Sequence, residues 1–320
     1  MHLTNLRRLT RASALAVTLA LPAAAQAATP PGVATGGAAT ITFSSAQLTG
    51  SVDPNGAQTT YQFQYGTTKA YGSVTPTATA AGTARKAVTA DLTGLAPATT
   101  YHYRLIAGNA KGQTMGRDRT FRTRRQPLGV TFSATPNPIL TGGTATLSGQ
   151  LTGTGNSGRQ IALESNPFPY TQGFKQEGNA VVTDAAGNYS FGLTAVALNT
   201  QYRVRLPDAP SVVSPIVVVS VQPRISTHIA TTRVSRGGRL TFSGTIRPAM
   251  DGTAVAIQKL GSKGRWVTVA GTVARHSGSG ESRYSKKVTI RRGGTYRVYA
   301  GVANGQLVPN TGREIHIRTR

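Results

Sequence analysis

Histidines and carboxylates are the side chains best suited to acid–base or metal chemistry, and this sequence has few of either. The histidines that follow residue 27 are His102, His228, His276 and His316. No two of them have the i, i+4 spacing with which a histidine pair holds zinc on a helix. His102 and His316 fall on the outward side of alternating segments, where an imidazole faces solvent. We therefore predict that the protein is not an enzyme and has no metal site and no cofactor.

The 10 acidic residues include two in typical turn sequences. Asp53 begins Asp-Pro-Asn-Gly, and Asp184 begins Asp-Ala-Ala-Gly-Asn. An aspartate in such a segment accepts hydrogen bonds from backbone amides a few residues further on. A calcium site needs several oxygens at one point, and each of these loops offers a single carboxylate. We expect both aspartates to stabilise turns.

Basic residues, in contrast, are abundant and unevenly placed. Lys and Arg number 35 against 10 Asp and Glu, a formal net charge of +25. Residues 28–126 hold 10 basic and 3 acidic residues, residues 127–222 hold 4 of each, and residues 223–320 hold 18 and 3. The densest run consists of Arg283, Lys286, Lys287, Arg291 and Arg292. Most of the positive charge is therefore expected on a C-terminal domain.

Such a charge attracts polyanions, with an affinity that falls as the salt concentration rises. The partner that we expect for this run is an anionic cell-envelope polymer or an acidic polysaccharide. Sequence-specific nucleic-acid binding is not expected, because no segment predicts a helix that could enter a DNA groove. The alternative explanation of the charge is a bias in genome composition. Of the basic residues 27 are Arg and 8 are Lys, an excess of Arg that a GC-rich genome would produce. The neutral segment 127–222 argues against bias as the whole explanation.

Aromatic residues offer an alternative function, that of a carbohydrate-binding module. Phe168, Tyr170 and Phe174 lie in one Pro-containing loop and could stack on sugar rings. The opposing interpretation is that this loop folds over the end of a domain and buries its rings. The single tryptophan, Trp266, lies in an alternating stretch and is expected to pack in a core.

The first 27 residues are typical of an export signal. Three arginines precede an apolar run at residues 12–25, and Ala25-Gln26-Ala27 fits a signal peptidase site. There is no later stretch like a transmembrane helix, no Cys to carry a lipid and no Leu-Pro-x-Thr-Gly motif. We expect a secreted, extracellular protein whose association with the cell envelope is non-covalent. Residues 28–37, rich in Pro and Gly, are expected to form a flexible tether.

The remaining sequence consists of short alternating segments separated by Gly, Pro, Asn and Asp. In one of them, Tyr61, Phe63 and Tyr65 alternate with glutamines. This period of two predicts β-strands, and no later segment sustains a helical period. Many short strands with frequent turns indicate antiparallel sandwiches.

Two motifs recur at nearly the same distance along the chain. Thr141–Gly149 returns as Arg236–Gly244, and Gln201–Val204 returns as Thr295–Val298. We therefore predict that residues 128–222 and residues 223–320 are copies of one domain. Short linkers are expected at residues 124–128 and 221–224.

A tyrosine near the start of a late strand marks each of the three expected domains. These tyrosines are Tyr101, Tyr202 and Tyr296. In sandwich domains such a ring enters the core while its hydroxyl bonds backbone at a corner of the chain. We expect all three to have this structural role.

Three segments of the first domain carry a resemblance to a known family. They are Leu48–Gly56, Tyr61–Gly66 and Leu92–Arg104, the last of which contains Leu-x-Pro-x-Thr-x-Tyr. Through them, residues 38–124 resemble a bacterial fibronectin type III domain. The two copies that follow are similar to immunoglobulin-like repeats of bacterial secreted proteins, through Thr183–Phe191 and the paired motifs.

These resemblances imply an all-β fold of three tandem antiparallel β-sandwiches, and they imply little about function. Combined with the charge, the expected function is that of a non-catalytic binding or spacer protein, secreted or associated with the envelope, whose basic C-terminal domain contacts anionic surface polymers.

Overall fold

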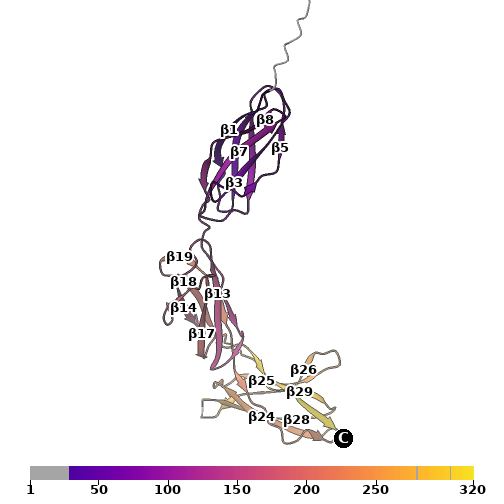
Figure 1. Ribbon diagram of the computed structural model, residues 1–320. Coiled ribbons are helices and arrows are strands. Elements are labelled where there is room, and N and C mark those ends of the chain that lie inside the picture. The colour runs from indigo at the N-terminus through magenta and orange to yellow at the C-terminus, as the bar shows by residue number, and fades with distance from the viewer. Residues whose placement is uncertain (1–28, 279, 303) are drawn as a thin grey trace, which may run out of the picture. The chain divides into compact units, whose positions relative to one another are not determined.

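The computed structural model describes residues 29–278, 280–302 and 304–320, and all of their regular secondary structure is β. The predicted all-β class is therefore confirmed (Figure 1), and the strand pairs are antiparallel apart from two parallel pairs, β12 with β21 and β23 with β31. Residues 1–27, where the export signal is predicted, lie outside the described residues. Within the described part of the chain there is no helix with the length and apolar character needed to cross a membrane. The described residues form two compact units, which meet between Arg124 and Arg125 in the sequence.

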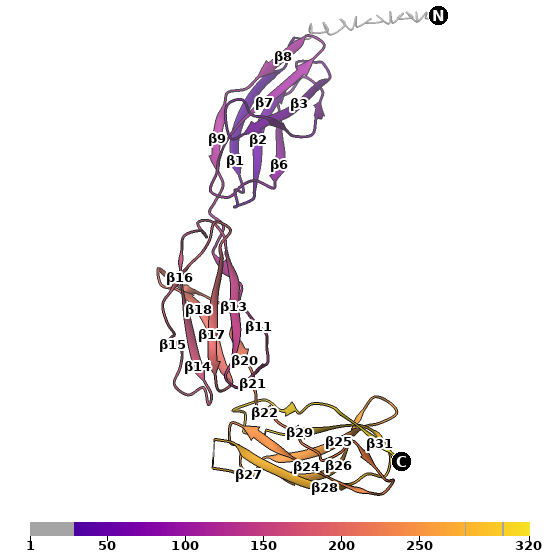
Figure 2. The ribbon, with the colours of Figure 1, turned by 60° about the horizontal axis from the view of Figure 1, so that its bottom comes forward.

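The first unit is one sandwich of two antiparallel sheets. One sheet has the order β1-β2-β6, with the three strands side by side in Figure 2. The other has the order β4-β3-β7-β8, where β5 pairs with β3 and β9 pairs with β7. The strands are β1 (Gly32–Ala39), β2 (Ser45–Asp53), β3 (Thr59–Gly66), β4 (Ser73–Val74), β5 (Ala78–Ala80), β6 (Lys86–Thr93), β7 (Thr100–Asn109), β8 (Gly112–Met115) and β9 (Arg119–Arg122). Alternate side chains meet between the sheets, and Leu48, Phe63 and Leu105 are fully buried there.

The prediction of a flexible tether at residues 28–37 is wrong for the residues from Gly32 onward. Gly32–Ala39 forms β1 and pairs along its length with β2. The buried hydroxyl of Thr35 accepts a hydrogen bond from the amide of Leu105 at 3.1 Å. This strand is held by backbone and hydroxyl hydrogen bonds and has few apolar side chains, so its sequence gave little sign of it. The first domain thus begins before residue 38.

The second unit starts with a sandwich whose core contains Leu147, Ile161 and Val204. Strand β13 pairs with β10, β11 and β17, while β14 and β18 form the centre of the opposite sheet. The strands are β10 (Gly129–Val130), β11 (Ser133–Thr135), β12 (Ile139–Leu140), β13 (Gly143–Thr152), β14 (Gln160–Pro167), β15 (Lys175–Gln176), β16 (Val181–Val182), β17 (Asn188–Val196), β18 (Thr200–Leu206), β19 (Ala209–Val213), β20 (Val217–Val219) and β21 (Val221–Gln222).

A third sandwich completes this unit, with Phe242, Ile257 and Val298 in its core. Its sheets have the orders β22-β24-β28-β27 and β23-β31-β29-β25-β26, with β30 paired to β29. Figure 1 shows β24 beside β28. The strands are β22 (Arg224–Ile225), β23 (Arg233–Val234), β24 (Arg239–Arg247), β25 (Ala254–Leu260), β26 (Trp266–Val273), β27 (Arg275–His276), β28 (Ser282–Thr289), β29 (Gly294–Ala300), β30 (Asn310–Thr311) and β31 (Ile315–Thr319).

The glycines of the first recurring motif have a common steric cause. A Cβ on Gly149 would overlap the carbonyl oxygen of Thr131 and would lie 2.5 Å from the hydroxyl of Tyr189. Gly244 has the matching neighbours, Ser226 and Tyr284. In both domains the tyrosine hydroxyl donates to that same carbonyl oxygen. Glycine is needed because the carbonyl of a neighbouring chain segment and a tyrosine hydroxyl both approach the backbone at this point.

The predicted corner tyrosines all have buried rings. The hydroxyl of Tyr296 donates to the carbonyl of Arg292 at 2.8 Å, and the hydroxyl of Tyr101 accepts the amide of Ala96 at 2.9 Å. The predicted backbone bond is thus confirmed for these two. For Tyr202, burial of the ring is confirmed.

The second and third sandwiches share part of their packing. Leu307, which lies between β29 and β30 of the third, is 2% exposed and belongs to the core of the second. The side chain of Asn199 donates to the carbonyl of Gly305 at 2.8 Å and accepts the amide of Val221 at 2.7 Å. The linker expected at residues 221–224 is therefore wrong in part, because β21 and β22 leave only Pro223 between them.

Candidate functional site

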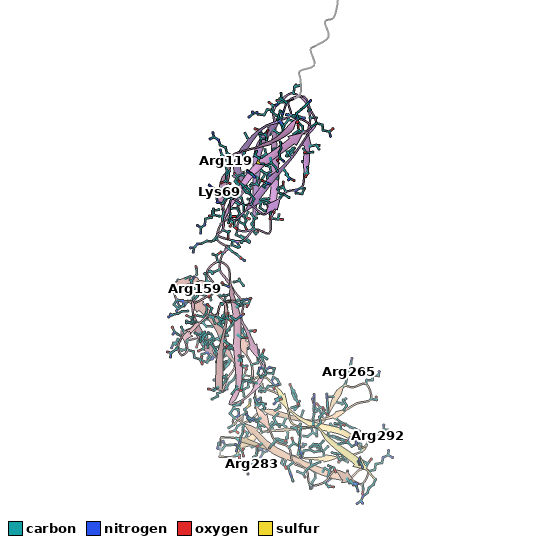
Figure 3. The ribbon with its side chains drawn as sticks, in the orientation of Figure 1. Lys69, Arg119, Arg159, Arg265, Arg283 and Arg292 are labelled. Carbon is teal, nitrogen blue, oxygen red and sulfur yellow. The ribbon has the colours of Figure 1, made fainter. Side chains whose placement is uncertain are left out.

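The five basic residues predicted to contact a polyanion do not form one patch. Arg283 lies near the start of β28, whereas Arg291 and Arg292 follow its end. The six rises of extended strand from residue 283 to residue 289 span roughly 20 Å. Figure 3 shows Arg283 and Arg292 far apart at the two ends of the sandwich. Lys287 is exposed between them. Lys286 is half-buried and points to the opposite face of β28.

Arg291 and Arg292 instead lie beside a second basic turn. Gly237 and Gly238, which separate Arg236 from Arg239, form two backbone hydrogen bonds with Ile290: the amide of Gly237 donates at 2.9 Å, and the carbonyl of Gly238 accepts at 2.8 Å. These bonds hold the turn at residues 236–239 against the end of β28. Two arginines of each turn are thereby brought to the same end of the domain.

The C-terminal strand adds further arginines at this end. The amide of Arg236 donates to the carbonyl of Arg320 at 3.1 Å, and Arg233 is the register partner of Arg318. We define the distal arginine cluster as Arg233, Arg236, Arg239, Arg291, Arg292, Arg318 and Arg320. All seven are exposed, and none has an ion-pair partner among the described residues.

The turn that carries Arg291 and Arg292 is itself firmly held. The carbonyl of Arg292 accepts hydrogen bonds from the hydroxyl of Tyr296 at 2.8 Å and from Nζ of Lys259 at 3.1 Å. Burial raises the pKa of Tyr296 above its usual value, so this hydroxyl remains a donor at neutral pH. The turn is therefore pre-organised, which lowers the conformational entropy that binding would cost.

Two open grooves lie between β26 and β28 and extend from the distal arginine cluster toward Arg283. One, of about 700 Å³, is lined by Val269, Val288 and Tyr296 together with the basic residues Lys259, Lys287, Arg291 and Arg292. The other, of about 580 Å³, is lined by Thr272, Val273 and Ser285 together with Arg275 and Arg283. Every ionisable side chain that lines them, apart from tyrosine, is basic.

Glu281 reduces the positive charge at the other end of β28. One of its carboxylate oxygens accepts from Nε of Arg247 at 2.6 Å, and the other lies 3.9 Å from Nε of Arg283. The hydrogen bond from Arg247 holds the pKa of Glu281 below its usual value, so the carboxylate is charged at neutral pH. The distal arginine cluster, without such a partner, is the stronger anion site.

The aromatic loop of the second sandwich has its rings largely engaged. Phe168 and Tyr170 meet edge to face, with centroids 5.6 Å apart. A Cβ on Gly305, in the segment that carries Leu307, would lie 3.1 Å from the Phe168 ring. The guanidinium of Arg203 covers the Phe174 ring, 4.1 Å from its centroid. All three rings are half-buried. This packing follows the interpretation of a loop folded over the end of its domain.

The arginine over Phe174 is one of three equivalent arginines, a repeat that the sequence analysis missed. In each sandwich an arginine stacks on an aromatic ring and donates through Nε to its cross-strand partner. The three sets are Arg104 with Tyr71 and Gln64, Arg203 with Phe174 and Glu164, and Arg297 with Trp266 and Gln258. The prediction that Trp266 packs in the core is therefore wrong: the ring is half-buried, outside the core cluster, with Arg297 4.0 Å from its centroid.

The predicted turn roles of the two aspartates are confirmed. Asp53 accepts the amide of Asn55 at 3.2 Å, and Asp184 accepts the amides of Ala186 and Asn188 at 2.9 and 2.8 Å. The backbone amides donate to Oδ1 of each aspartate, as in a turn, and Oδ2 of Asp184 accepts the side-chain amide of Asn188 at 3.0 Å.

Two histidines pair with single aspartates. His102 lies 2.8 Å from Asp118, to which the hydroxyl of Tyr71 also donates, and His276 lies 3.1 Å from Asp251. Within the described ranges no three His, Cys, Asp or Glu residues are grouped so that they could hold a metal ion. His316 is exposed between buried isoleucines, as its alternation predicts.

No protein-family model matches the chain, and no curated protein does. Among solved structures, the chain is similar to the FN1-FN3 domains of chicken CNTN1, with 17% identity and a TM-score of 0.30, over 90% of this chain and 99% of that one. It is also similar to a tetra-tandem repeat in the extending region of a large adhesion protein, with 16% identity and a TM-score of 0.29, over 91% of this chain and 75% of the other. Neither likeness bears on what this chain does.

Proposed function

We propose that this chain is a non-catalytic binding or spacer protein, secreted or associated with the cell envelope, whose C-terminal domain contacts anionic surface polymers. The observation that carries the proposal is the distal arginine cluster. Seven exposed arginines from three chain segments are brought together by backbone hydrogen bonds and have no acidic partner among the described residues.

The chemistry of the cluster suits a polymer of carboxylate, sulfate or phosphate groups. A guanidinium donates two parallel hydrogen bonds to such a group and remains charged at any physiological pH. Arg236 and Arg292 lie on turns that are already fixed, so little order has to be gained on binding. The neighbouring sandwich, with 4 basic and 4 acidic residues in 127–222, supplies no comparable field.

The family assignments belong to the same proposal. In the first unit a three-stranded sheet faces a six-stranded one, in which β4 and β5 both pair with β3, and β8 and β9 both pair with β7. This arrangement is consistent with a fibronectin type III domain at residues 38–124, now extended back to Gly32. The β22-β24-β28-β27 sheet of the third sandwich follows the four-stranded sheet of an immunoglobulin constant-type domain. Export of the chain rests on the sequence of residues 1–27.

The alternative function, glycan stacking by Phe168, Tyr170 and Phe174, gains no support from the packing of the rings. A stacking platform needs a free ring face, and Arg203 already covers Phe174. We therefore favour the charged site over the aromatic one.

The test is binding of the full mature chain to immobilised heparin, a sulfated polysaccharide, at increasing NaCl concentration. The informative variant replaces Arg236, Arg239, Arg291 and Arg292 with Gln. We expect its affinity to fall at least tenfold at physiological salt, and the slope of log K against log salt to fall by roughly 2 to 4. Both effects follow from the loss of four contacts that release counterions.

The matched control replaces four exposed arginines of the first unit, Arg117, Arg119, Arg122 and Arg124, with Gln. It changes the net charge by the same amount. If both variants lose affinity equally, the attraction is a property of net charge and the distal arginine cluster is not a site. Salt-independent absence of binding by the unaltered chain would also refute the proposal.

A further inference from the structure

Strand β26 has an open edge. In its sheet it is the last strand, and it pairs only with β25 among the described strands. Strand β28 across the groove is open in the same way, since β27 pairs only with its first two residues, Ser282 and Arg283. The two strands approach each other at Thr272, whose hydroxyl donates to the carbonyl of Ser285 at 3.4 Å. Unpaired backbone amides and carbonyls therefore face the grooves between β26 and β28.

The open edge is also apolar. Val267, Val269 and Val273 of β26 are 56%, 45% and 47% exposed, and β26 contains no charged residue. An edge strand with exposed β-branched residues is prone to pair with another extended chain. Native sheets commonly protect such an edge with a lysine or a proline, and β26 has neither along its length. Its bulge at Val269 is a partial protection only.

The basic residues around the edge of β26 determine which charge a partner strand should carry. Among the described residues, six basic ones and no acidic one line the two grooves: Lys259, Lys287, Arg291 and Arg292 in one, Arg275 and Arg283 in the other. A second copy of this chain would bring the same positive charge to the same place and would be repelled. An acidic partner would be attracted.

We propose that β26 binds an extended acidic polypeptide segment, which adds to the sheet as a further strand beside the basic grooves. The backbone of β26 would supply the hydrogen bonds, and the basic residues would pair with carboxylates of the segment. Val267 and Val273, which the bulge at Val269 places on opposite faces of the sheet, would contact apolar side chains on both faces of the segment. This site shares Arg291 and Arg292 with the distal arginine cluster, but it also requires backbone hydrogen bonds from the open edge of β26, which the polymer contact does not.

A polypeptide fits these observations better than a polysaccharide does. An acidic polysaccharide would satisfy the basic residues, but it has no regular row of amides and carbonyls to match an open strand edge. It also has no apolar side chains to cover Val267 and Val273. Both the open edge and the exposed valines are accounted for only when the ligand is itself a β-strand.

The test uses the full mature chain and a synthetic peptide of Glu and Val residues, with Val on both faces of the extended peptide, as long as the 8-residue strand β26. The only tryptophan, Trp266, lies in β26, so its fluorescence reports on binding directly. Amide hydrogen exchange of residues 266–273 provides the second readout. We expect a saturable fluorescence change and slower exchange in β26. The same peptide with alternate amides N-methylated should bind at least tenfold more weakly, because it keeps the charge and the side chains but loses donors to the sheet.

Two protein variants locate the site. Val267→Thr combined with Val273→Thr keeps the shape of the edge and removes its apolar contacts, and we expect affinity to fall several-fold. The control is Val182→Thr in the second sandwich, where an equally exposed valine (61%) lies away from these grooves. Neutralising Arg236 and Arg239 should weaken heparin binding and leave peptide binding nearly unchanged, which distinguishes failure of this proposal from failure of the polymer proposal.

Three results would overturn the strand-addition proposal. They are equal binding of the N-methylated and unmodified peptides, absence of protection at residues 266–273, and no detectable binding of the peptide at low salt. The first would show charge attraction without strand pairing, the second binding elsewhere, and the third no site at all.

Discussion

Replacing Leu307 with Ala should destabilise the second sandwich, although the residue belongs to the third by sequence. Its side chain is 2% exposed and lies in the core with residues of the second sandwich. The change removes three buried carbons, about 0.8 kcal/mol each, and leaves a cavity, so we expect a loss of about 3 kcal/mol. A loss of that size raises the equilibrium constant for unfolding of the second sandwich roughly 100-fold.

Hydrogen exchange measured by mass spectrometry on the full chain resolves the effect by segment. Amides of β14 and β18, in the second sandwich, should exchange roughly 100-fold faster in Leu307→Ala when exchange proceeds through unfolding. The control is Leu260→Ala, which alters a leucine of the third sandwich that is 36% exposed. Faster exchange confined to β25 and β29 of the third sandwich would contradict the shared packing. So would an unchanged rate in β14 and β18.

Two further predictions concern the second sandwich. Gly149→Ala should lower the melting temperature by several degrees, since the new Cβ would overlap a backbone carbonyl, whereas Gly192→Ala, with nothing within 4 Å, should have little effect; equal shifts would refute the steric argument. For Glu164, burial alone would raise the pKa, but hydrogen bonds from Arg205 and Arg203 hold it below the usual value. The stability that this carboxylate contributes is therefore present above its unfolded pKa and lost as the pH falls through the lower folded pKa. Glu164→Gln should flatten the decline of melting temperature on acidification below about pH 4.3, the usual glutamate value, and a decline as steep as that of the unaltered chain would show that the ion pairs add nothing.

The fold was predictable where burial depends on side chains. Tyr61, Phe63 and Tyr65 alternate as a half-buried strand must, and the recurring glycine motif marks the same close approach in two domains. Strand β1 was not predictable in the same way, because Gly, Ala and Thr form its hydrogen bonds without an apolar pattern. Backbone pairing of this kind leaves little trace in composition.

The candidate sites were predictable only in part. The excess of charge in residues 223–320 is visible in the sequence, but proximity in the chain is a poor guide to proximity in a sandwich. Arg283 and Arg292 are separated by the length of a strand, while Arg236 and Arg292 are brought together by hydrogen bonds between turns. Trp266 was misplaced because alternation does not distinguish a core position from one at an open edge. A sequence signal for the stacked arginines did exist. In each domain an aromatic residue follows the residue that accepts the arginine's Nε hydrogen bond by seven to ten positions.

Because Leu307 of the third sandwich packs in the core of the second, the second sandwich is not a self-contained module. A gene segment that encoded the second sandwich alone would produce a domain with a cavity in its core. The leucine that fills this space, Leu307, lies 307 − 221 = 86 residues beyond Val221, the last buried valine of that sandwich. Asn199, whose amide bonds the backbone of that same downstream segment, would lose its acceptor as well. A chain that contains the second sandwich without the segment that carries Leu307 should therefore be less stable than one that contains residues 125–320 together.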